Sequence, residues 1–571
     1  MDTLAAHKAE WAALPVPAKL ALLKEVKARV LDQPLAWATA SAQQVKKEAG
    51  EEAVAQELVA TVVLVTLAID GYIASLITYQ KTGAFPAPPM RQAPSGQTVA
   101  KVFPWGFKES KLNPLGAAGV QAELYLRPGC AATQGEFYRS GSKEGRVCVA
   151  LGAGNQQFLS LLDALHQLFV EGTVVALKYH PIQDGEHGMG SERAPVAPYI
   201  DHVLAPLARR GFFGSVLCGV EATKHLVYHP LADCVCMTGG TATHDAIVWG
   251  PREEQEGRKA RNDPLLKVPI TSELGCVTPW LVVPGPWTEA ELTHHAKALA
   301  QAVLNNCSCN CLAAKVILLA DGWDQGDAFI GKVKQELASY PLPNPYYPGM
   351  RDRYAAFKER YPTAEPVAGR PADPSQPCGE VLPTLVNVLD RFPANGKEEY
   401  AFQVEPFAPI VTFAKVPCQP GPGKSLEEAY LQEAVRTANE DIWGTLSCSL
   451  IVHPETERQH AAAVQAALDA LRYGSVVLNS WSLVGYLVMP GHWGAFQGDQ
   501  TLQDVGSGIG GVHNTYLFDH PEKTVVRTPF TSGIHPMPPN TSKLPLSVAK
   551  VVAGLSHSGL LGALRMAFKS A

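Results

Sequence analysis

A secretory signal, an uninterrupted long apolar run and a basic stripe are all missing from this sequence of 571 residues. The first 23 residues have the charged pattern of an amphipathic helix, with no apolar core behind a basic start, so we expect no signal peptide. The net charge is −6 and no basic stripe stands out, so we expect no nucleic-acid partner. Charged residues make up only 18% and hydrophobic residues 46%, which is typical of a globular enzyme and not of a disordered chain.

The apolar and cysteine contents point to the same class of protein. The most apolar run, residues 58–77, is interrupted by Asp70 and diluted by Thr61 and Thr66, so it predicts a buried helix and not a membrane span. Twelve cysteines without a signal predict free thiols in a reducing compartment, and therefore a cytoplasmic protein. The length allows two or three domains with ample cores.

Three of the cysteines lie close together, alternating with small polar residues, directly before an apolar run that predicts a buried strand. They are Cys307, Cys309 and Cys311, and the apolar run is 312–319. Small core side chains, a metal site and a catalytic thiolate are three interpretations of this stretch. The C-x-C-x-C pattern lacks the C-x-x-C spacing of structural zinc sites, so we expect no metal. A thiolate needs a base and an oxyanion donor from elsewhere in the chain.

The rest of the chain has an α/β pattern. Residues 1–80 predict helices, and 81–115 form a Pro- and Gly-rich extended stretch. A strand at 146–151, a helix at 158–170 and a strand at 173–178 form a βαβ unit, and the pattern repeats through strands at 214–219 and 234–240. Further strands are predicted at 279–283, 474–479 and 516–518, a helix at 289–304, and surface excursions at 251–263 and 340–377. The tail from Leu544 has a Gly-interrupted helical pattern that ends with Arg565 and Lys569.

Several motifs in this order resemble the aldehyde dehydrogenase superfamily over about residues 1–530. They are Asn155 after a Gly-rich turn, Lys178 at the end of the next strand, Thr238-Gly239-Gly240-Thr241, Glu273-Leu274-Gly275, Cys311 in the cysteine stretch, and Glu405-Pro406-Phe407-Ala408-Pro409. Each motif is a weak signal alone, because Gly152-x-Gly154 and Gly239-Gly240 also occur in ordinary tight turns. Their common order makes the resemblance specific.

The resemblance implies a fold with a Rossmann-like cofactor domain, an α/β catalytic domain and a β-strand oligomerisation arm. By its pattern, residues 1–116 and 149–272 form the cofactor domain and 273–505 the catalytic domain. Residues 117–148 and 506–530 correspond to the arm, and 531–571 are a C-terminal extension beyond the resemblance. Because an isolated two-stranded arm leaves open edges, we expect a homodimer or homotetramer.

The resemblance also implies a reaction, namely oxidation of an aldehyde to a carboxylic acid with NAD or NADP. It makes Cys311 the nucleophile, Asn155 an oxyanion donor and Glu273 the base that activates water. The implied cofactor-binding residues are Lys178, Gly239, Gly240, Thr241, Glu405 and Phe407.

Departures from the family pattern keep alternatives open. Trp is missing before Asn155, Gly-Gln is missing before Cys311, and Cys276 replaces the second glycine after Glu273. Pro181 stands where NAD-preferring members often carry Glu, which favours acceptance of NADP. The alternatives are a coenzyme A-acylating enzyme or acyl reductase, a non-catalytic scaffold, and Cys309 or Cys307 as the nucleophile. We expect His244 and His492 to be ordinary surface or loop residues.

Overall fold

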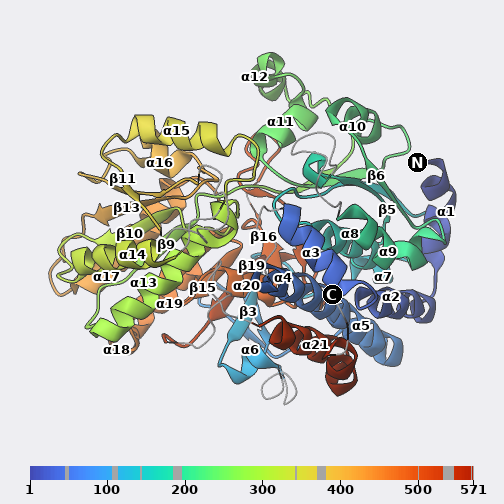
Figure 1. The fold of residues 1–571 in the computed structure, drawn as a ribbon, viewed down its shortest axis with the longest axis horizontal. Coiled ribbons are helices and arrows are strands. Elements are labelled where there is room, and N and C mark those ends of the chain that lie inside the picture. Colours follow the sequence, from blue (N-terminus) through green and yellow to red (C-terminus); the bar gives the residue numbers. More distant parts are fainter. Residues whose placement is uncertain are drawn as a thin grey trace.

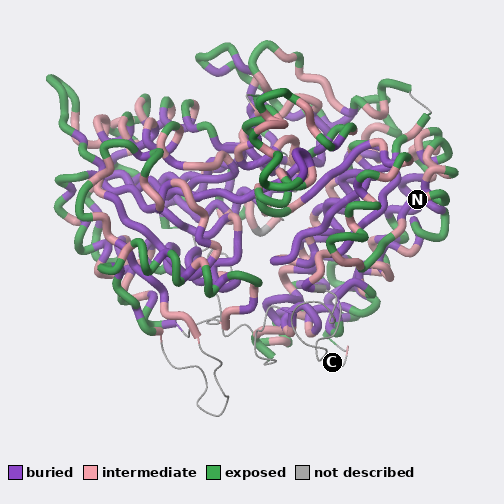
Figure 2. Tube along the Cα trace, turned by 90° about the horizontal axis from the view of Figure 1, so that it is seen from above, coloured by how far each residue is buried: buried purple, intermediate pink, exposed green. Residues whose placement is uncertain are grey.

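Two α/β parts lie side by side in the computed structural model, which describes residues 1–44, 51–105, 113–141, 144–183, 196–340, 344–369, 381–498, 500–531, 545–567 and 569. Figure 1 shows one part, in blue and teal, around a six-stranded sheet and the other, in yellow and orange, around an eleven-stranded sheet. In Figure 2 buried residues run through the interior of both parts, and exposed residues lie on the outer helices and loops. The predicted α/β class is therefore confirmed.

Helices form the first part of the chain, as its Ala-, Leu- and Lys-rich sequence predicts. They are α1 (Asp2–Ala13), α2 (Val16–Val30), α3 (Pro34–Gln44), α4 (Glu51–Leu58), a π-helical turn η1 (Val59–Val63) and α5 (Leu64–Thr82). The continuous helix Glu51–Thr82 is long and apolar enough to cross a membrane by length and composition, but 56% of its apolar window is buried inside the protein. It ends at Gly83, whose φ of 73° suits a left-handed helix cap. The prediction of a buried helix at 58–77 is confirmed.

The six-stranded sheet has the order β17-β8-β7-β4-β5-β6. All pairs are parallel except β17 with β8. Its strands are β4 (Val147–Leu151), β5 (Val174–Tyr179), β6 (Phe213–Leu217), β7 (Cys234–Thr238), β8 (Ile270–Glu273) and β17 (Gly508–Ile509). The helices between them are α8 (Leu159–Phe169), η3 (Pro181–Gln183), α9 (Ala197–Ala208), α10 (Val220–Val227), α11 (Thr241–Trp249) and α12 (Arg252–Arg261). This is the Rossmann-like arrangement that the βαβ pattern predicts.

The eleven-stranded sheet has the order β1-β2-β3-β19-β15-β14-β9-β10-β13-β12-β11. All pairs from β19 to β12 are parallel, and the strands at both ends pair antiparallel. The central strands are buried along their whole length, which is why their sequences are continuous apolar runs. The strands are β1 (Met90–Gln92), β2 (Thr98–Phe103), β3 (Gln121–Leu126), β9 (Pro279–Val282), β10 (Val316–Ala320), β11 (Glu365–Val367), β12 (Thr384–Val388), β13 (Ile410–Val416), β14 (Ser447–Ile451), β15 (Ser475–Leu478) and β19 (Pro521–Arg527).

The remaining elements connect the strands, pack around the two parts or, in the case of β16 and β18, form a separate two-stranded sheet. They are α6 (Pro114–Ala117), α7 (Glu136–Ser140), α13 (Glu289–Leu304), η4 (Asn305–Ser308), α14 (Gly326–Ser339), α15 (Met350–Arg360), η5 (Gly396–Glu398), α16 (Tyr400–Gln403), α17 (Leu426–Glu440), α18 (Pro454–Gln459), α19 (Ala461–Ala470), α20 (Leu483–Leu487), β16 (His492–Gly494), β18 (Gly511–His513) and α21 (Leu546–Ala567). Helix α13 has the predicted bounds because Thr288 and Glu291 form a capping box at its start.

The predicted arm strands pair with each other but do not leave the body of the chain. Strand β3 runs antiparallel to β19, and β19 in turn pairs in parallel with β15 of the same chain. In the described residues, the strands from which we predicted a homodimer or homotetramer are therefore part of the sheet of their own chain. The oligomeric state stays a prediction, which size-exclusion chromatography at micromolar concentration tests.

Other predictions need correction. Residues 516–518 form a turn with one isolated bridge from Phe518 to Gln134, and the strand begins at Pro521 instead. The charged excursion at 251–263 lies on the surface as expected, but it contains the helix α12. Residues 370–377 of the second excursion and 532–544 of the C-terminal extension lie outside the described residues.

Candidate active site

The carboxyl ends of three neighbouring strands bring most of the predicted site residues to one edge of the six-stranded sheet. Asn155 follows β4, Gly239 follows β7, and Glu273 ends β8. The chain winds outward from β4 in one direction to β5 and β6 and in the other to β7 and β8, so this edge is a topological switch point. Crevices at such points are where open α/β sheets bind ligands.

The cysteine stretch reaches this edge in a strained turn before β10. Asn306, Cys307 and Ser308 have φ values of 53°, 54° and 60°, three successive non-glycine residues in the left-handed region. Each costs about 1 kcal/mol or more. The Asn306 amide donates to the carbonyls of Asn155 (3.0 Å) and Cys309 (3.1 Å), which compensates part of the strain. Asn306 thus fixes the shape of the turn.

The three thiols of the turn have different surroundings. The Cys307 side chain is buried with its sulfur 3.7 Å from Met350 Sδ, and the Cys309 side chain is buried with its sulfur 3.5 Å from the Phe407 carbonyl. Cys311 alone of the three keeps partial exposure, and its sulfur lies 3.8 Å from Asn310 Oδ1. This difference in access favours Cys311 as the reactive thiol. The part of the chain that the structure describes contains no group of three or more His, Cys, Asp or Glu residues placed to hold a metal.

Two hydrogen-bond donors lie around Cys311. The Asn155 amide donates one hydrogen to the Cys309 carbonyl at 3.1 Å, which orients the amide along the turn and leaves its second hydrogen free. The backbone N–H of Cys311 donates to no residue in the described ranges, while its carbonyl accepts from Thr278 Oγ1 at 2.8 Å. A fixed backbone N–H beside an amide is the donor set that an oxyanion requires.

Glu273 is buried with a strongly perturbed carboxyl. Burial and the negative charge of Asp163 raise the pKa of Glu273 to about 8, and a hydrogen bond from Trp493 Nε1 to Oε1 (2.7 Å) partly opposes this increase. A carboxyl that titrates near neutral pH can both take and release a proton. Glu273 and Asn155 thus both lie close to the cysteine turn.

Glu405 packs against the Glu273-Leu274-Gly275 motif. A Cβ atom on Gly275 would come within 2.0 Å of Glu405 Oε2, so only glycine leaves room for this carboxyl. Burial raises the pKa of Glu405 to about 7, while the cations Lys315 and Arg353 lower it. Its Oε1 is buried and has no hydrogen-bond partner among the described residues, so it is available to a ligand.

Lys315 and Trp493 are site residues that the sequence analysis missed. Lys315 is buried and donates to the Ser308 carbonyl (3.0 Å), so it also stabilises the strained turn. Burial and the carboxyls of Glu273 and Glu405 raise the pKa of the Cys311 thiol well above its usual range, whereas Lys315 lowers it. The only sequence signal for Lys315 was a cation inside an apolar run. Trp493 had none, because 220 positions separate it from Glu273.

The residues predicted to bind the cofactor border the same edge. Lys178 is buried at the end of β5, burial lowers its pKa, and its ammonium makes no hydrogen bond within the described residues. Gly239 and Gly240 form an exposed turn before α11, whose first residue Thr241 has a buried hydroxyl without a partner in the described part of the chain. Such a helix N-terminus favours anionic groups. Phe407, with a φ of 43°, lies 6.0 Å from the Lys315 ammonium and so belongs to the cysteine side of the site.

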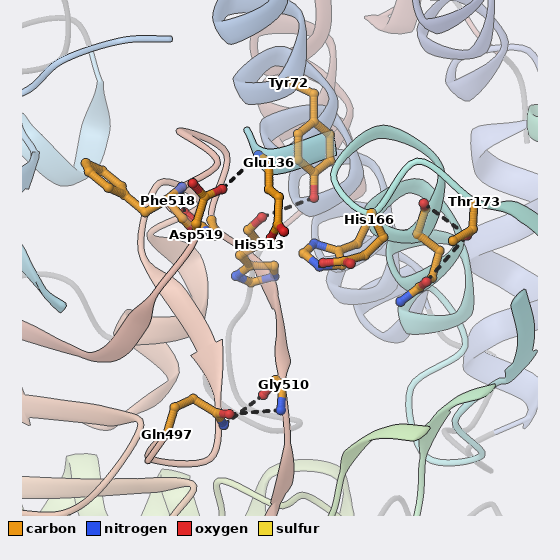
Figure 3. A network of polar contacts seen from close by, with 12 residues as sticks. Tyr72, Glu136, His166, Thr173, Gln497, Gly510, His513, Phe518 and Asp519 are labelled. Atoms are coloured by element: carbon orange, nitrogen blue, oxygen red, sulfur yellow. Dashed lines mark hydrogen bonds and ion pairs between the residues drawn. The ribbon is translucent and has the colours of Figure 1, made fainter. Parts of the chain in front are cut away.

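The two histidines expected at the surface are buried instead. His244 belongs to α11 and is fully buried, and His492 is 3% exposed. His492 lines a separate cavity of about 550 Å³, which also includes His166, Glu136 and Asp519 in its walls. Figure 3 shows this region, with Glu136 and Asp519 beside His513 and His166. The walls of this cavity contain none of the residues predicted to be catalytic.

Comparisons with known proteins bear on the fold. No protein-family model and no curated protein sequence matches the chain. Solved aldehyde dehydrogenase structures do match it in three dimensions. The aldehyde dehydrogenase KauB from Pseudomonas aeruginosa has a TM-score of 0.59 at 16% identity, covering 92% of this chain and 87% of its own. Gamma-glutamyl-gamma-aminobutyraldehyde dehydrogenase from Burkholderia cenocepacia J2315 has a TM-score of 0.59 at 17% identity, with coverage of 92% and 87%. Lactaldehyde dehydrogenase from Escherichia coli has a TM-score of 0.57 at 15% identity, with coverage of 93% and 90%. The chain therefore has the aldehyde dehydrogenase fold, which confirms the predicted fold.

Proposed function

We propose that this protein oxidises an aldehyde to a carboxylic acid with NAD or NADP, through a thioester on Cys311. The observation that carries the proposal is the meeting of a partly exposed thiol, an amide donor and a buried base at one edge of the sheet. Structural neighbours include an indole-3-acetaldehyde dehydrogenase complexed with NAD+ and a glyceraldehyde-3-phosphate dehydrogenase complexed with NADP. They support the reaction class and leave the aldehyde open.

In this proposal, each step of the reaction is assigned to a different residue. The Cys311 thiolate attacks the carbonyl carbon, and the oxygen that becomes negative accepts hydrogen bonds from the Asn155 amide and the Cys311 N–H. Loss of hydride from this carbon leaves a thioester. Glu273 then takes a proton from water, the hydroxide attacks the thioester, and the acid leaves as the Cys311 sulfur is released. The raised pKa of the Cys311 thiol means that it is mostly protonated at neutral pH, so a base has to accept its proton before the attack.

The cofactor side of the site fits a dinucleotide. A bound NAD(P) would supply the hydride acceptor. Glu405 Oε1 is buried without a hydrogen-bond partner among the described residues, and Lys178 is a buried residue at the end of β5. A carboxylate and an ammonium both suit ribose hydroxyls. Gly239, Gly240 and Thr241 provide the open helix N-terminus for a diphosphate.

Three enzyme forms test the proposal. NAD(P)H formation is followed with aliphatic and aromatic aldehydes for wild type, Cys311→Ala and Glu273→Gln, each with NAD and with NADP. We expect turnover in wild type, none in Cys311→Ala, and a single burst of about one NAD(P)H per site in Glu273→Gln because the thioester is not hydrolysed. Cys309→Ala is the matched control, since it removes a neighbouring thiol that is buried.

Each other outcome has a definite meaning. Activity that survives in Cys311→Ala contradicts the assignment of the nucleophile. Wild-type turnover that requires coenzyme A would replace hydrolysis with acyl transfer. Cofactor binding without turnover of any aldehyde would favour a scaffold protein over an enzyme.

A further inference from the structure

The last helix exposes a large apolar face. Seven of the fourteen exposed large hydrophobic residues in the described part of the chain belong to α21. They are Val548, Val551, Val552, Leu555, Leu560, Leu561 and Leu564. Leu560 and Leu561 are 79% and 76% exposed, far beyond the partial exposure of scattered surface leucines. Contiguous exposed apolar patches of this kind mark interaction surfaces.

The helix is folded back on itself as a hairpin. Ser558 and Gly559 have non-helical backbone angles in its middle. A Cβ atom on Gly554 would come within 2.3 Å of the Gly562 carbonyl oxygen, so the two halves touch backbone to backbone. Lys550 Nζ also donates to the carbonyl of Lys569 at 2.7 Å, across the two halves. The chain thus forms two short helical segments, 546–557 and 560–567, which we call the C-terminal hairpin.

The opposite face of the hairpin is fixed to the protein. Ala549, Ala553 and Ala563 are buried against the N-terminal helices, and α21 packs on α4, η1 and α5. His557 Nε2 lies 2.7 Å from the Lys27 carbonyl, and Arg565 binds Asp32 at 3.2 Å. Figure 1 shows α21 at the edge of the molecule, beside α5 and near the chain end. The hairpin therefore presents its leucines outward from a firmly held base.

The basic residues of the C-terminal segment indicate what kind of partner the apolar face of the hairpin binds. Residues 528–571 contain four Lys and Arg residues and no Asp or Glu, although the whole chain has a net charge of −6. The Arg565 side chain is 49% exposed and pairs with Asp32, while the ammonium groups of Lys550 and Lys569 donate to backbone carbonyls of the same chain. Two copies packed through this face would bring like charges together with no acidic residue from either hairpin to pair with them. An anionic lipid surface satisfies both the apolar side chains and the basic ones.

The length of the hairpin decides between lying on a membrane and crossing it. By length and composition alone, Leu546–Ala567 could cross one. The break at Ser558 leaves segments of about 18 Å and 12 Å, whereas a bilayer core is about 30 Å thick. The hairpin is thus long enough only to enter one leaflet.

We propose that the C-terminal hairpin docks this protein on an anionic membrane surface, with Leu560, Leu561 and Leu564 inserted at the level of the lipid headgroups. This role is independent of the proposed reaction, because none of these residues belongs to the candidate active site.

Vesicle flotation tests the proposal with the full chain. The probes are vesicles of phosphatidylcholine alone and of phosphatidylcholine mixed with phosphatidylserine. Wild type is compared with L560Q/L561Q/L564Q, and V220Q/L265Q is the matched control because it removes exposed aliphatic side chains far from the hairpin. We expect wild type and control to float with the anionic vesicles, and the triple variant to bind at least about tenfold more weakly. Wild type should bind the neutral vesicles more weakly than the anionic ones, by about fivefold for each basic side chain that the anionic lipid attracts.

Several results would overturn the proposal. They are no flotation of wild type with anionic vesicles, equal flotation of the triple variant, or equal binding to both vesicle types. A wild-type dimer that becomes monomeric in the triple variant, without vesicle binding, would show that a second copy covers the face instead. Equal thermal unfolding of wild type and the triple variant verifies that the substitutions leave the fold intact.

Discussion

Replacing Trp493 by phenylalanine should move the pH dependence of thioester hydrolysis to higher pH. The Trp493 indole donates a 2.7 Å hydrogen bond to Glu273, whose pKa is about 8 with this bond in place. A hydrogen bond to a charged group contributes about 1.5 to 3 kcal/mol. Since 1.36 kcal/mol corresponds to one pH unit, loss of the bond should raise the pKa of Glu273 by about 1 to 2 pH units.

The sign follows from the role of the base. Glu273 accepts a proton from water only when it is ionised, so kcat should increase with pH through its pKa. The measurement is the kcat profile between pH 6 and pH 10 with a saturating aldehyde, together with the burst of NAD(P)H that reports the steps before hydrolysis. We expect the inflection near pH 8 in wild type. In Trp493→Phe it should lie about 1 to 2 pH units higher, with the burst amplitude preserved.

Trp481→Phe is the matched control for this experiment. Trp481 is also buried and donates an indole hydrogen bond of 2.7 Å, but its acceptor is the Leu312 carbonyl and not a carboxylate. Its loss should leave the inflection near pH 8. An unchanged inflection in Trp493→Phe, or the same displacement in both variants, would refute the assignment of Glu273 as the base tuned by Trp493.

Further variants test other parts of the site. In Gly275→Ala, the new Cβ atom would lie 2.0 Å from Glu405 Oε2 and must displace that carboxyl. We expect steady-state kinetics to show a KM for the cofactor at least about tenfold higher. Urea denaturation should show a loss of about 1 to 3 kcal/mol in unfolding free energy. Lys315→Met removes the cation that lowers the pKa of Cys311, so the rate of thiol alkylation at neutral pH should fall. A rate equal to that of wild type would contradict this effect of Lys315 on the thiol. In wild type, the alkylation rate of Cys311 should keep increasing above pH 9, because its thiol pKa lies well above the usual range. A plateau near neutral pH would contradict the influence of the carboxyls of Glu273 and Glu405 on this thiol.

Local sequence patterns predicted many of the strands and helices of the fold. The apolar strands and the helices between them follow from hydrophobic period and from turn residues, as with α13 and its capping box at Thr288. The resemblance of the motifs to a known family, and not strand pattern, pointed to Asn155 and Glu273, which the structure places after β4 and at the end of β8. The prediction of a strand at 516–518 is wrong because a turn closed by a hydrogen bond from the Leu517 N–H to the Asn514 carbonyl occupies these positions, and β19 begins only at Pro521.

Contacts between distant segments decided what local patterns could not. The sequence alone defined the α/β class, the order of the motifs and the cysteine stretch with its neighbouring strand. Only the tertiary structure made Cys311 the accessible thiol, brought Trp493 to Glu273, and buried Lys315 beside the strained turn. It also joined β3 and β19 to the sheet of their own chain. The physical reason is that burial, and with it each pKa, depends on which side chains pack around a group, and most of these come from positions remote in sequence.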